Sequence, residues 1–546
     1  MWLRNGEDMN KTLKISALLS GAVILGSTVV PVTASAAKYK AINWTESANV
    51  GTMDPSKTTA AIDFNYLQAI GEGLYRMDKS GKPQLAGATS VDKSDDGLTL
   101  TYHLRDMKWS NGDDVTADDY VYGWQRTNDP KTASQYAYLY SGIKNADAVQ
   151  DGDKPVTDLG VKAIDDHTLE VTLDRPMPQL ESVLTMATFE PQNKKFVDKV
   201  GKKYGTTAKY TLSNGPYTMK GWTGSNNKFS LVKNSDYWDA KTVKSPKITI
   251  QTIKDQNTGY NLYKSKKVDY TTLSPDQYKA SKNKKDYTVI AQASTAFIEF
   301  NQNKKPLDNQ NIRKALSKSI DRKTMSSKIL GGTGTPATSF TSTKLAKDPA
   351  TGKDYAKVAG DKNEVGYDLK EAKKLWKQGL KETGKKKVTL QYVTDDTDAA
   401  KRSAQFIQSQ MQKLPGLKVT IKTVPFKQRI SLAEDKKFDM INTIWGADYA
   451  DPSTFLDLYT SDSSFNHGSW KNAEYDNIMK AAKTTDVNDD EKRYADYAKA
   501  EKILQEDAAI APTFYQAKPS LLNTKVKGVV SNTVGAPFDW KWAYKK

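Results

Sequence analysis

Cysteine is absent from the 546 residues, which excludes disulfide bonds, thiolate metal sites, cysteine nucleophiles and thioether-linked lipid anchors. Histidine is scarce, and His103, His167 and His467 lie far apart, so a histidine-rich metal site is not expected. Only ten of the 81 basic residues are arginine. A lysine-dominated net charge of +17, spread over the whole chain, suits a solvated surface facing polyanions better than a nucleic-acid groove.

Long apolar runs are also missing, except for one near the N-terminus. Lys11 and Lys14 precede an apolar run at 15–30 (ISALLSGAVILGSTVV), and a small-x-small cleavage pattern follows at 34–36. The run is broken by polar residues and glycines and is short for a membrane span. We therefore expect residues 1–36 to be a cleaved signal peptide, with a membrane anchor as the alternative.

The composition supplies material for two or three buried cores. The chain is 38% hydrophobic and 10% aromatic, and it is longer than one ordinary domain. Strand-like alternation is expected at 98–104, 168–173, 247–253 and 419–424, and helices at 311–320, 369–380, 399–414 and 492–505. The lysine-rich stretch 344–362 is expected to be an exposed loop. This mixture predicts an α/β protein whose sheets are covered by helices.

The sequence contains no recognisable catalytic or metal-binding pattern. None of the histidines lies in a nucleophile-elbow or metal motif, and no Walker motif is present. Adjacent aspartates are typical of turns and helix starts here, rather than of a glycosidase pair or a calcium site. We therefore expect no enzymatic activity, no cofactor and no metal, and nucleotide hydrolysis would belong to a separate partner.

Five sequence blocks carry a resemblance to one family. They are NVGTMDP at 49–55 with IGEGLYR at 70–76; SDDGL at 94–98 through WQR at 124–126; SNGPY at 213–217 with LVKNSDYW at 231–238; NIRKAL at 311–316 through IDR at 320–322; and WGADY at 445–449 with DP at 451–452. Together they resemble the periplasmic or extracellular oligopeptide-binding proteins of ABC importers, the family-5 solute-binding proteins. The resemblance covers essentially the whole mature chain.

The first four blocks also have a purely structural interpretation. Thr116 is expected to cap a helix, with Asp119 three residues further on. The SNGP sequence at 213–216 is typical of a turn that enters a strand. We therefore expect these blocks to serve folding rather than ligand contact.

The resemblance implies a two-lobed periplasmic-binding-protein-like fold of type II, cluster C, with ligand enclosed between the lobes. Lobe one would comprise residues 38–71 with 194–299 and 515–546, and lobe two residues 300–514. An extra subdomain of lobe one would span 72–193. A two-strand hinge would cross near 297–301 and 513–516, and hinge closure would enclose the cargo.

The resemblance also implies a peptide site centred on the fifth block. A site that accepts many sequences should bind the backbone and the termini of a peptide. In the family, an aspartate at the position of Asp448 pairs with the α-amino group of the peptide; a helix cap or surface acid is the alternative. The other expected contacts are the backbone of Gly446 and Ala447, and the residues Trp445, Tyr449, Tyr136, Phe426, Asn442 and one or more of Phe514, Tyr515 and Gln516.

The chain departs from the family where relatives hold the carboxylate end of short peptides. They use arginines and a histidine in lobe two, whereas Ala433 and Asn442 stand at the matching positions here, and no histidine lies near Ala399. We therefore expect longer peptides without a clamped C-terminus, or peptides bound in another register. The lysines could supply a replacement cation, but the sequence does not indicate which one.

The implied partners are oligopeptides, an ABC permease and its separate ATPase subunits, with no nucleic acid, and the protein is expected to be monomeric. Because no lipid-bearing cysteine follows the leader, we expect a secreted protein held at the cell surface by anionic cell-wall polymers or the membrane surface. A periplasmic location is the alternative. An adhesin or moonlighting protein on the same fold remains open, as does narrower cargo such as a peptide pheromone, a dipeptide, a metal chelate or a sugar, although Asp448 disfavours a sugar.

Overall fold

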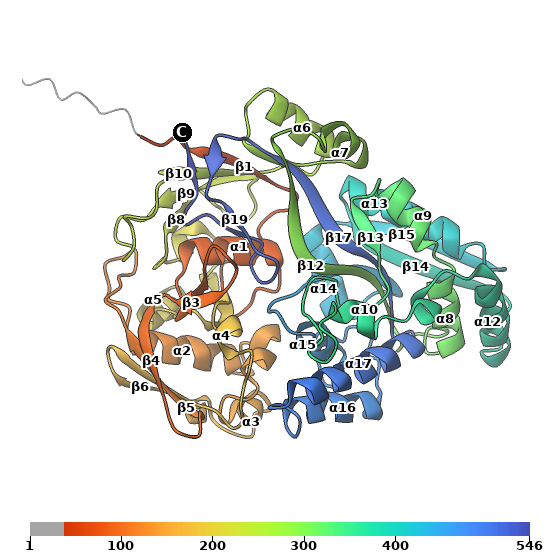
Figure 1. Cartoon of the computed structure of the whole chain (residues 1–546), viewed down its shortest axis with the longest axis horizontal. Helices are drawn as coiled ribbons and strands as arrows, with labels where there is room; N and C mark the ends of the chain where they lie inside the picture. The colour runs from red at the N-terminus through yellow and green to blue at the C-terminus, as the bar shows by residue number, and fades with distance from the viewer. Residues whose placement is uncertain (1–37) are drawn as a thin grey trace, which may run out of the picture. The chain divides into compact units, whose positions relative to one another are not determined.

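The computed structural model describes residues 38–546, so the predicted signal peptide at 1–36 lies outside the described residues. Three larger sheets organise this part of the chain, and helices cover them (Figure 1). Within residues 38–546, no helix has the length and apolar character needed to cross a membrane.

The first sheet has four strands in the order β1 (Ile42–Glu46), β10 (Lys247–Thr252), β9 (Lys228–Lys233) and β8 (Tyr217–Lys220). Ile248 and Ile250 of β10 are buried and their neighbours are not, as the period-two pattern at 247–253 predicts. Trp44 stacks on Tyr270 at 3.9 Å between ring centroids and meets Trp540 edge-on at 5.6 Å. We call the buried cluster that contains these rings and α1 (Ala61–Ile70) the first core.

The second sheet is antiparallel and lies wholly within residues 72–193. Its order is β4 (Ala88–Lys93), β5 (Thr99–Leu104), β7 (Thr168–Thr172) and β6 (Val161–Asp165), which confirms the strands expected at 98–104 and 168–173. Helix α2 (Ala117–Asn128) begins at the expected cap, where the Thr116 amide donates to the Asp119 carboxylate at 3.3 Å. Asp119 also accepts from the indole of Trp109 at 2.8 Å, so this motif ties a turn to a helix start.

The third sheet contains the two longest strands, β12 (Tyr287–Phe300) and β17 (Ile510–Leu522), which run side by side (Figure 1). The order is β11 (Tyr270–Thr272), β17, β12, β16 (Met440–Gly446), β14 (Val388–Asp395) and β15 (Leu417–Val424), and β13 (Gly334–Pro336) also pairs with β17. The predicted hinge crossings fall inside β12 and β17. The domain boundaries themselves stay a prediction.

The predicted helices are present and pack on the third sheet. They are α8 (Gln310–Lys318), α12 (Leu369–Glu382), α13 (Asp398–Met411) and α17 (Asp490–Glu506), and α14 (Phe426–Glu434) follows β15. Ile312 and Leu316 of α8 and Trp376 of α12 are buried with Ile298 of β12 in what we call the second core. Other helices are α3 (Ala146–Gln150), α4 (Leu180–Val183), α5 (Lys194–Val200), α6 (Gln256–Lys264), α7 (Pro275–Ser281), α9 (Arg322–Thr324), α11 (Lys362–Val365), α15 (Ser453–Leu456) and α16 (Ala473–Lys483).

A buried charge network joins the first and third sequence blocks. Arg76 pairs with Glu72 and with Asp539, at 2.8 Å in each case, and all three side chains are almost fully buried. Glu72 also accepts from the indole of Trp238 at 3.3 Å and from the hydroxyl of Tyr237. A buried charge needs such partners, so these block residues hold the fold together.

Three small ladders complete the described chain: β2 (Tyr75–Met77) with β3 (Pro83–Leu85), β18 (Val526–Lys527) with β21 (Tyr544–Lys545), and β19 (Val530–Ser531) with β20 (Phe538–Asp539). The exposed loop expected at 344–362 is wrong in part, because α10 (Tyr355–Ala359) forms there. Tyr355 and Ala356 are buried, and the Tyr355 ring meets Tyr494 of α17. The high lysine content of the stretch favoured the prediction of a loop, although the short segment at 355–359 is amphipathic.

Candidate functional site

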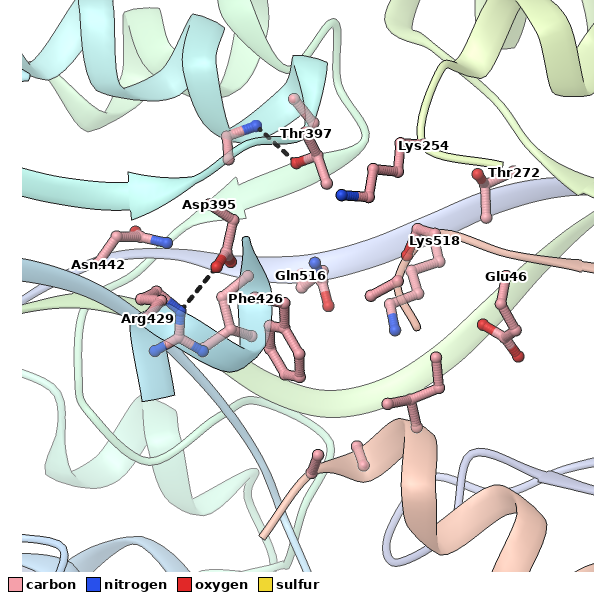
Figure 2. A pocket seen from close by; sticks show the side chains of 18 of the residues that line it. Glu46, Lys254, Thr272, Asp395, Thr397, Phe426, Arg429, Asn442, Gln516 and Lys518 are labelled. Carbon is pink, nitrogen blue, oxygen red and sulfur yellow. Dashed lines mark hydrogen bonds and ion pairs between the residues drawn. The ribbon is translucent and has the colours of Figure 1, made fainter. Parts of the chain in front are cut away.

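A cavity of about 630 Å³ lies beside the two long strands. The ends of β1 and β11 and the start of α1 form one side, and β14, α13, α14 and β16 form the other. Figure 2 shows Glu46 on the first side, Phe426 and Asn442 on the second, and Gln516 and Lys518 projecting from β17 between them. The volume lies within the range of about 300–1,000 Å³ that is usual for ligand pockets.

Strand β16 presents an open backbone edge to this cavity. It pairs with β12 from Met440 to Gly446, but β14 pairs with it only at Met440 and Ile441. Residues 442–445 line the cavity, and Ile444 is 38% exposed. Across the cavity, Glu46 ends β1 and residues 47–50 follow it without forming a strand. The open edge of β16 therefore faces a space in which an extended chain could pair with it.

Gly446 ends this edge and has room around it. A Cβ added there would lie 3.8 Å from the Cβ of Ser294, which is ordinary van der Waals contact. The described chain therefore does not require glycine at this position. Ala447, in contrast, is buried; its amide donates to the carbonyl of Ala293 and its carbonyl accepts from the amide of Gly535, each at 2.8 Å. The amide expected to pair with a ligand at Ala447 is thus already used within the protein.

Asp448 is buried just behind this edge and is only 5% exposed. Its Oδ1 accepts from the hydroxyl of Tyr136 at 3.2 Å, and its amide donates to the hydroxyl of Thr454 at 2.9 Å. Its Oδ2 is buried and has no hydrogen-bond partner within the described residues. Burial raises the pKa of this carboxyl to about 8, against a smaller opposing effect of the Tyr136 hydroxyl. An orphaned carboxylate oxygen is a place for a cation.

An aromatic cluster covers Asp448 on the cavity side. The ring of Tyr136 stacks on Trp445 at 6.3 Å, and Phe465 meets Trp445 edge-on at 4.9 Å and Tyr136 at 5.5 Å. Trp445 and Phe465 line the cavity, whereas Tyr136 and Asp448 do not. The tyrosine therefore comes from residues 72–193, as expected, and meets the fifth block.

The remaining predicted residues divide between the cavity and the core. Phe426, Asn442, Phe514 and Gln516 line the cavity. Tyr449 is 1% exposed, and its hydroxyl bonds to Ser453; Tyr515 is 6% exposed, and its hydroxyl bonds to Ser339 at 2.6 Å. Tyr449 and Tyr515 therefore pack within the protein and do not reach the cavity.

One cation on the cavity wall was not predicted from the sequence. The expected arginine positions carry Ala433 and Asn442, but Arg429 lies one helical turn before Ala433 on α14. Its guanidinium pairs with Asp395 at 2.9 Å and lies over the ring of Phe426 at 5.2 Å (Figure 2). Helical spacing of four residues could have identified it.

A second unpredicted group joins three distant parts of the sequence. Glu299 of β12 accepts from the hydroxyl of Thr443 at 2.5 Å and lies 3.2 Å from Nδ1 of His467. The Nε2 of His467 is buried and has no hydrogen-bond partner in the described part of the chain, and all three residues line the cavity. No local pattern indicates this cluster, because the residues are brought together only by the third sheet. Within the described part of the chain, no group of three or more potential ligands is placed to hold a metal.

Comparison with known proteins places this geometry in a family. The model of the bacterial extracellular solute-binding proteins, family 5 Middle, matches residues 82–467. A relative from Lactococcus lactis, named a dipeptide-binding protein, is 40% identical in an alignment that covers 98% of this chain and 100% of the relative. The structure of Listeria monocytogenes OppA bound to peptide is 41% identical with a TM-score of 0.89, covering 93% of this chain and 99% of that one.

A third similar structure is that of the pheromone receptor PrgZ, at 33% identity and a TM-score of 0.88, again over 93% of this chain and 99% of that one. These similarities extend over nearly the whole described chain and confirm the two-lobed α/β fold that the sequence resemblance implied. The chain belongs to the bacterial extracellular solute-binding proteins of family 5.

Proposed function

We propose that this protein captures oligopeptides in the cavity beside β16 and delivers them to an ABC permease. Relatives carry the names of dipeptide- and oligopeptide-binding proteins, and one similar structure contains a peptide. Solute-binding proteins of this kind act by capture and release, so no bond of the cargo is made or broken, and we expect no enzymatic activity.

The observation that carries the proposal is the edge of β16, which within residues 38–546 has no strand partner beyond Ile441 and ends next to a buried carboxyl oxygen without a hydrogen-bond partner. Residues 442–446 form this edge. An extended peptide of about five residues, at about 3.3 Å per residue, matches its length. Main-chain hydrogen bonds along the edge give affinity that does not depend on sequence. The cavity-lining Trp445, Phe426 and Phe514 would surround the side chains.

Asp448 would hold the amino terminus of the peptide. Its Oδ2 has no partner among residues 38–546, so an ammonium group that passes the aromatic cluster can bind there without displacing the Tyr136 hydroxyl from Oδ1. Pairing also removes the cost of an isolated buried carboxyl. The ring cluster of Tyr136, Trp445 and Phe465 would then close over the bound terminus and exclude water, which strengthens the ion pair.

Closure of two lobes over the cargo would create the form that docks on the permease. The ATPase subunits would be separate proteins. We further propose that the protein acts as a monomer and that its lysine-rich surface binds anionic cell-wall polymers or the membrane surface. Extraction of intact cells with molar salt should release the protein; retention at molar salt would contradict an electrostatic tether.

Narrower cargo is the second candidate, favoured by the similarity to the pheromone receptor PrgZ. Native mass spectrometry of the secreted protein, before and after unfolding and refolding, tests both. A ladder of co-purifying peptides supports broad capture and gives their lengths. One dominant peptide mass supports narrow cargo. A protein that stays empty after addition of a peptide mixture contradicts the proposed function.

A further inference from the structure

Two of the cations on the cavity wall have charges that are already compensated. Arg429 pairs with Asp395 and Lys254 pairs with Asp396, each at 2.9 Å. Figure 2 shows the Arg429–Asp395 pair on the side of the cavity formed by β14 and its neighbours, and Lys254 on the segment between β10 and α6. Neither cation can take up an anionic ligand without competing with its own carboxylate.

Lys518 differs from them in burial and in pairing. It is on β17, lines the middle of the cavity and projects into it (Figure 2). Its Nζ makes no hydrogen bond and no ion pair with any residue of 38–546, and its side chain is only partly exposed. Burial lowers the pKa of this ammonium group, and Glu46 opposes that shift only in part. The site therefore holds a cation that lacks a close counter-charge.

Two neighbours define what can approach Lys518. Gln516 is two residues away on the same strand, so both side chains project from one face, and its carboxamide makes no hydrogen bond within the described chain. Glu46 lies across the cavity (Figure 2). Burial raises the pKa of its carboxyl to about 7, and its Oε1 has no hydrogen-bond partner among residues 38–546. An ammonium and an amide N–H side by side match the two oxygens of one carboxylate.

We propose that Lys518, assisted by Gln516, binds a carboxylate group of the cargo peptide. The inference rests on the proposed function and adds to it the anionic anchor that the sequence did not reveal. A ligand carboxylate would supply the close counter-charge that Lys518 lacks among residues 38–546. The carboxylate has two sources: the C-terminus of a short peptide, or an aspartate or glutamate side chain of a longer one.

The test uses refolded, ligand-free protein and synthetic Gly/Ala hexapeptides measured by isothermal titration calorimetry. One peptide has a free C-terminus, one is C-terminally amidated, and a set of amidated peptides carries a single Glu at each position in turn. Each is titrated into wild type and into Lys518→Met. We expect Lys518→Met to weaken carboxylate-bearing peptides roughly tenfold to a hundredfold and to leave the neutral amide unchanged.

The pattern of loss identifies the source of the carboxylate. A loss confined to the free-acid peptide assigns the C-terminus, and a loss at one Glu position assigns a side-chain subsite. An equal loss of affinity for all peptides, or no loss for any of them, overturns the inference. In either case, binding of the neutral amide to wild type leaves the proposed function intact. Failure of wild type to bind every peptide contradicts the proposed function instead.

Two further variants separate ligand binding from stability. Lys527→Met removes one exposed lysine from β18 and should change no affinity, which controls for net charge. Glu46→Gln leaves Lys518 in place and removes the competing acid, so carboxylate-bearing peptides should bind several-fold more tightly at pH 8. If Lys518 only stabilises Glu46, Glu46→Gln will not tighten any peptide, and the inference fails.

Discussion

Substitution of Asp448 by asparagine should remove a pH dependence that the buried carboxyl imposes on peptide binding. Burial raises the pKa of Asp448 to about 8, so the carboxyl is mostly protonated at pH 6 in the ligand-free protein. A peptide ammonium pairs with the ionised form. Binding therefore releases a proton, and affinity must rise with pH until the carboxyl is ionised without ligand.

The magnitude follows from the pKa. At pH 6 the carboxyl must first lose a proton two units below its pKa, which costs about 2.7 kcal/mol, or roughly a hundredfold in Kd. At pH 7 the cost is about half of that, roughly tenfold. The dissociation constant should therefore fall about tenfold per pH unit from pH 6 and level off near pH 8, where the peptide's own amine begins to lose its proton at about the same pKa.

The assay is titration of one peptide and its N-acetylated form into wild type and Asp448→Asn between pH 6 and 8. The slope should appear only for wild type with the free amine. Asp462→Asn, which changes an exposed acid, should keep the wild-type slope. An equal slope in Asp448→Asn, or with the acetylated peptide, would refute the assignment of Asp448 to the amino terminus.

Three other changes have defined outcomes. Gly446→Ala should leave the melting temperature unchanged, because within residues 38–546 the added Cβ meets only Ser294, at 3.8 Å. The same change should weaken peptide binding roughly tenfold by calorimetry, and unchanged affinity would place the cargo elsewhere. Tyr136→Phe removes a hydroxyl that lowers the pKa of Asp448, so the midpoint of the pH–affinity curve should move upward, and no movement would contradict that contact. In urea melts of ligand-free protein, stability should fall as pH rises from about 4 to 8, because the folded state keeps a proton on Asp448 that the unfolded state releases; Asp448→Asn should remove a few kcal/mol of that loss.

Local signals in the sequence were sufficient for much of the fold. Period-two alternation gave β5 and β7, and the Thr116–Asp119 spacing gave the start of α2. The segment around Tyr355 was missed because its lysines dominate the composition while only a few apolar residues turn inward. Composition averages over a segment, whereas burial depends on which face each residue occupies.

The site was predictable only where its residues are contiguous or regularly spaced. Block five placed Trp445 at the cavity and Asp448 behind it, and period-two alternation explains why Tyr515 points away while its neighbours on β17 reach the cavity. Glu299 and His467 are 168 residues apart and meet only in the folded chain, so no local sequence pattern predicts their contact. The sequence also did not single out Lys518, because this residue differs from the other lysines only in lacking an ion pair or hydrogen bond within the described chain.

The position of Trp540 has a consequence for how the chain acquires its fold. This residue is fully buried among rings contributed by Trp44 and Tyr66, and the adjacent Asp539 pairs with Arg76. The first core is thus closed by residues that lie far from their partners along the chain, 463 positions in the case of Asp539 and Arg76. Contacts of such long range carry a large loop-closure cost, so the first core is complete only after the segment around Trp540 has joined it.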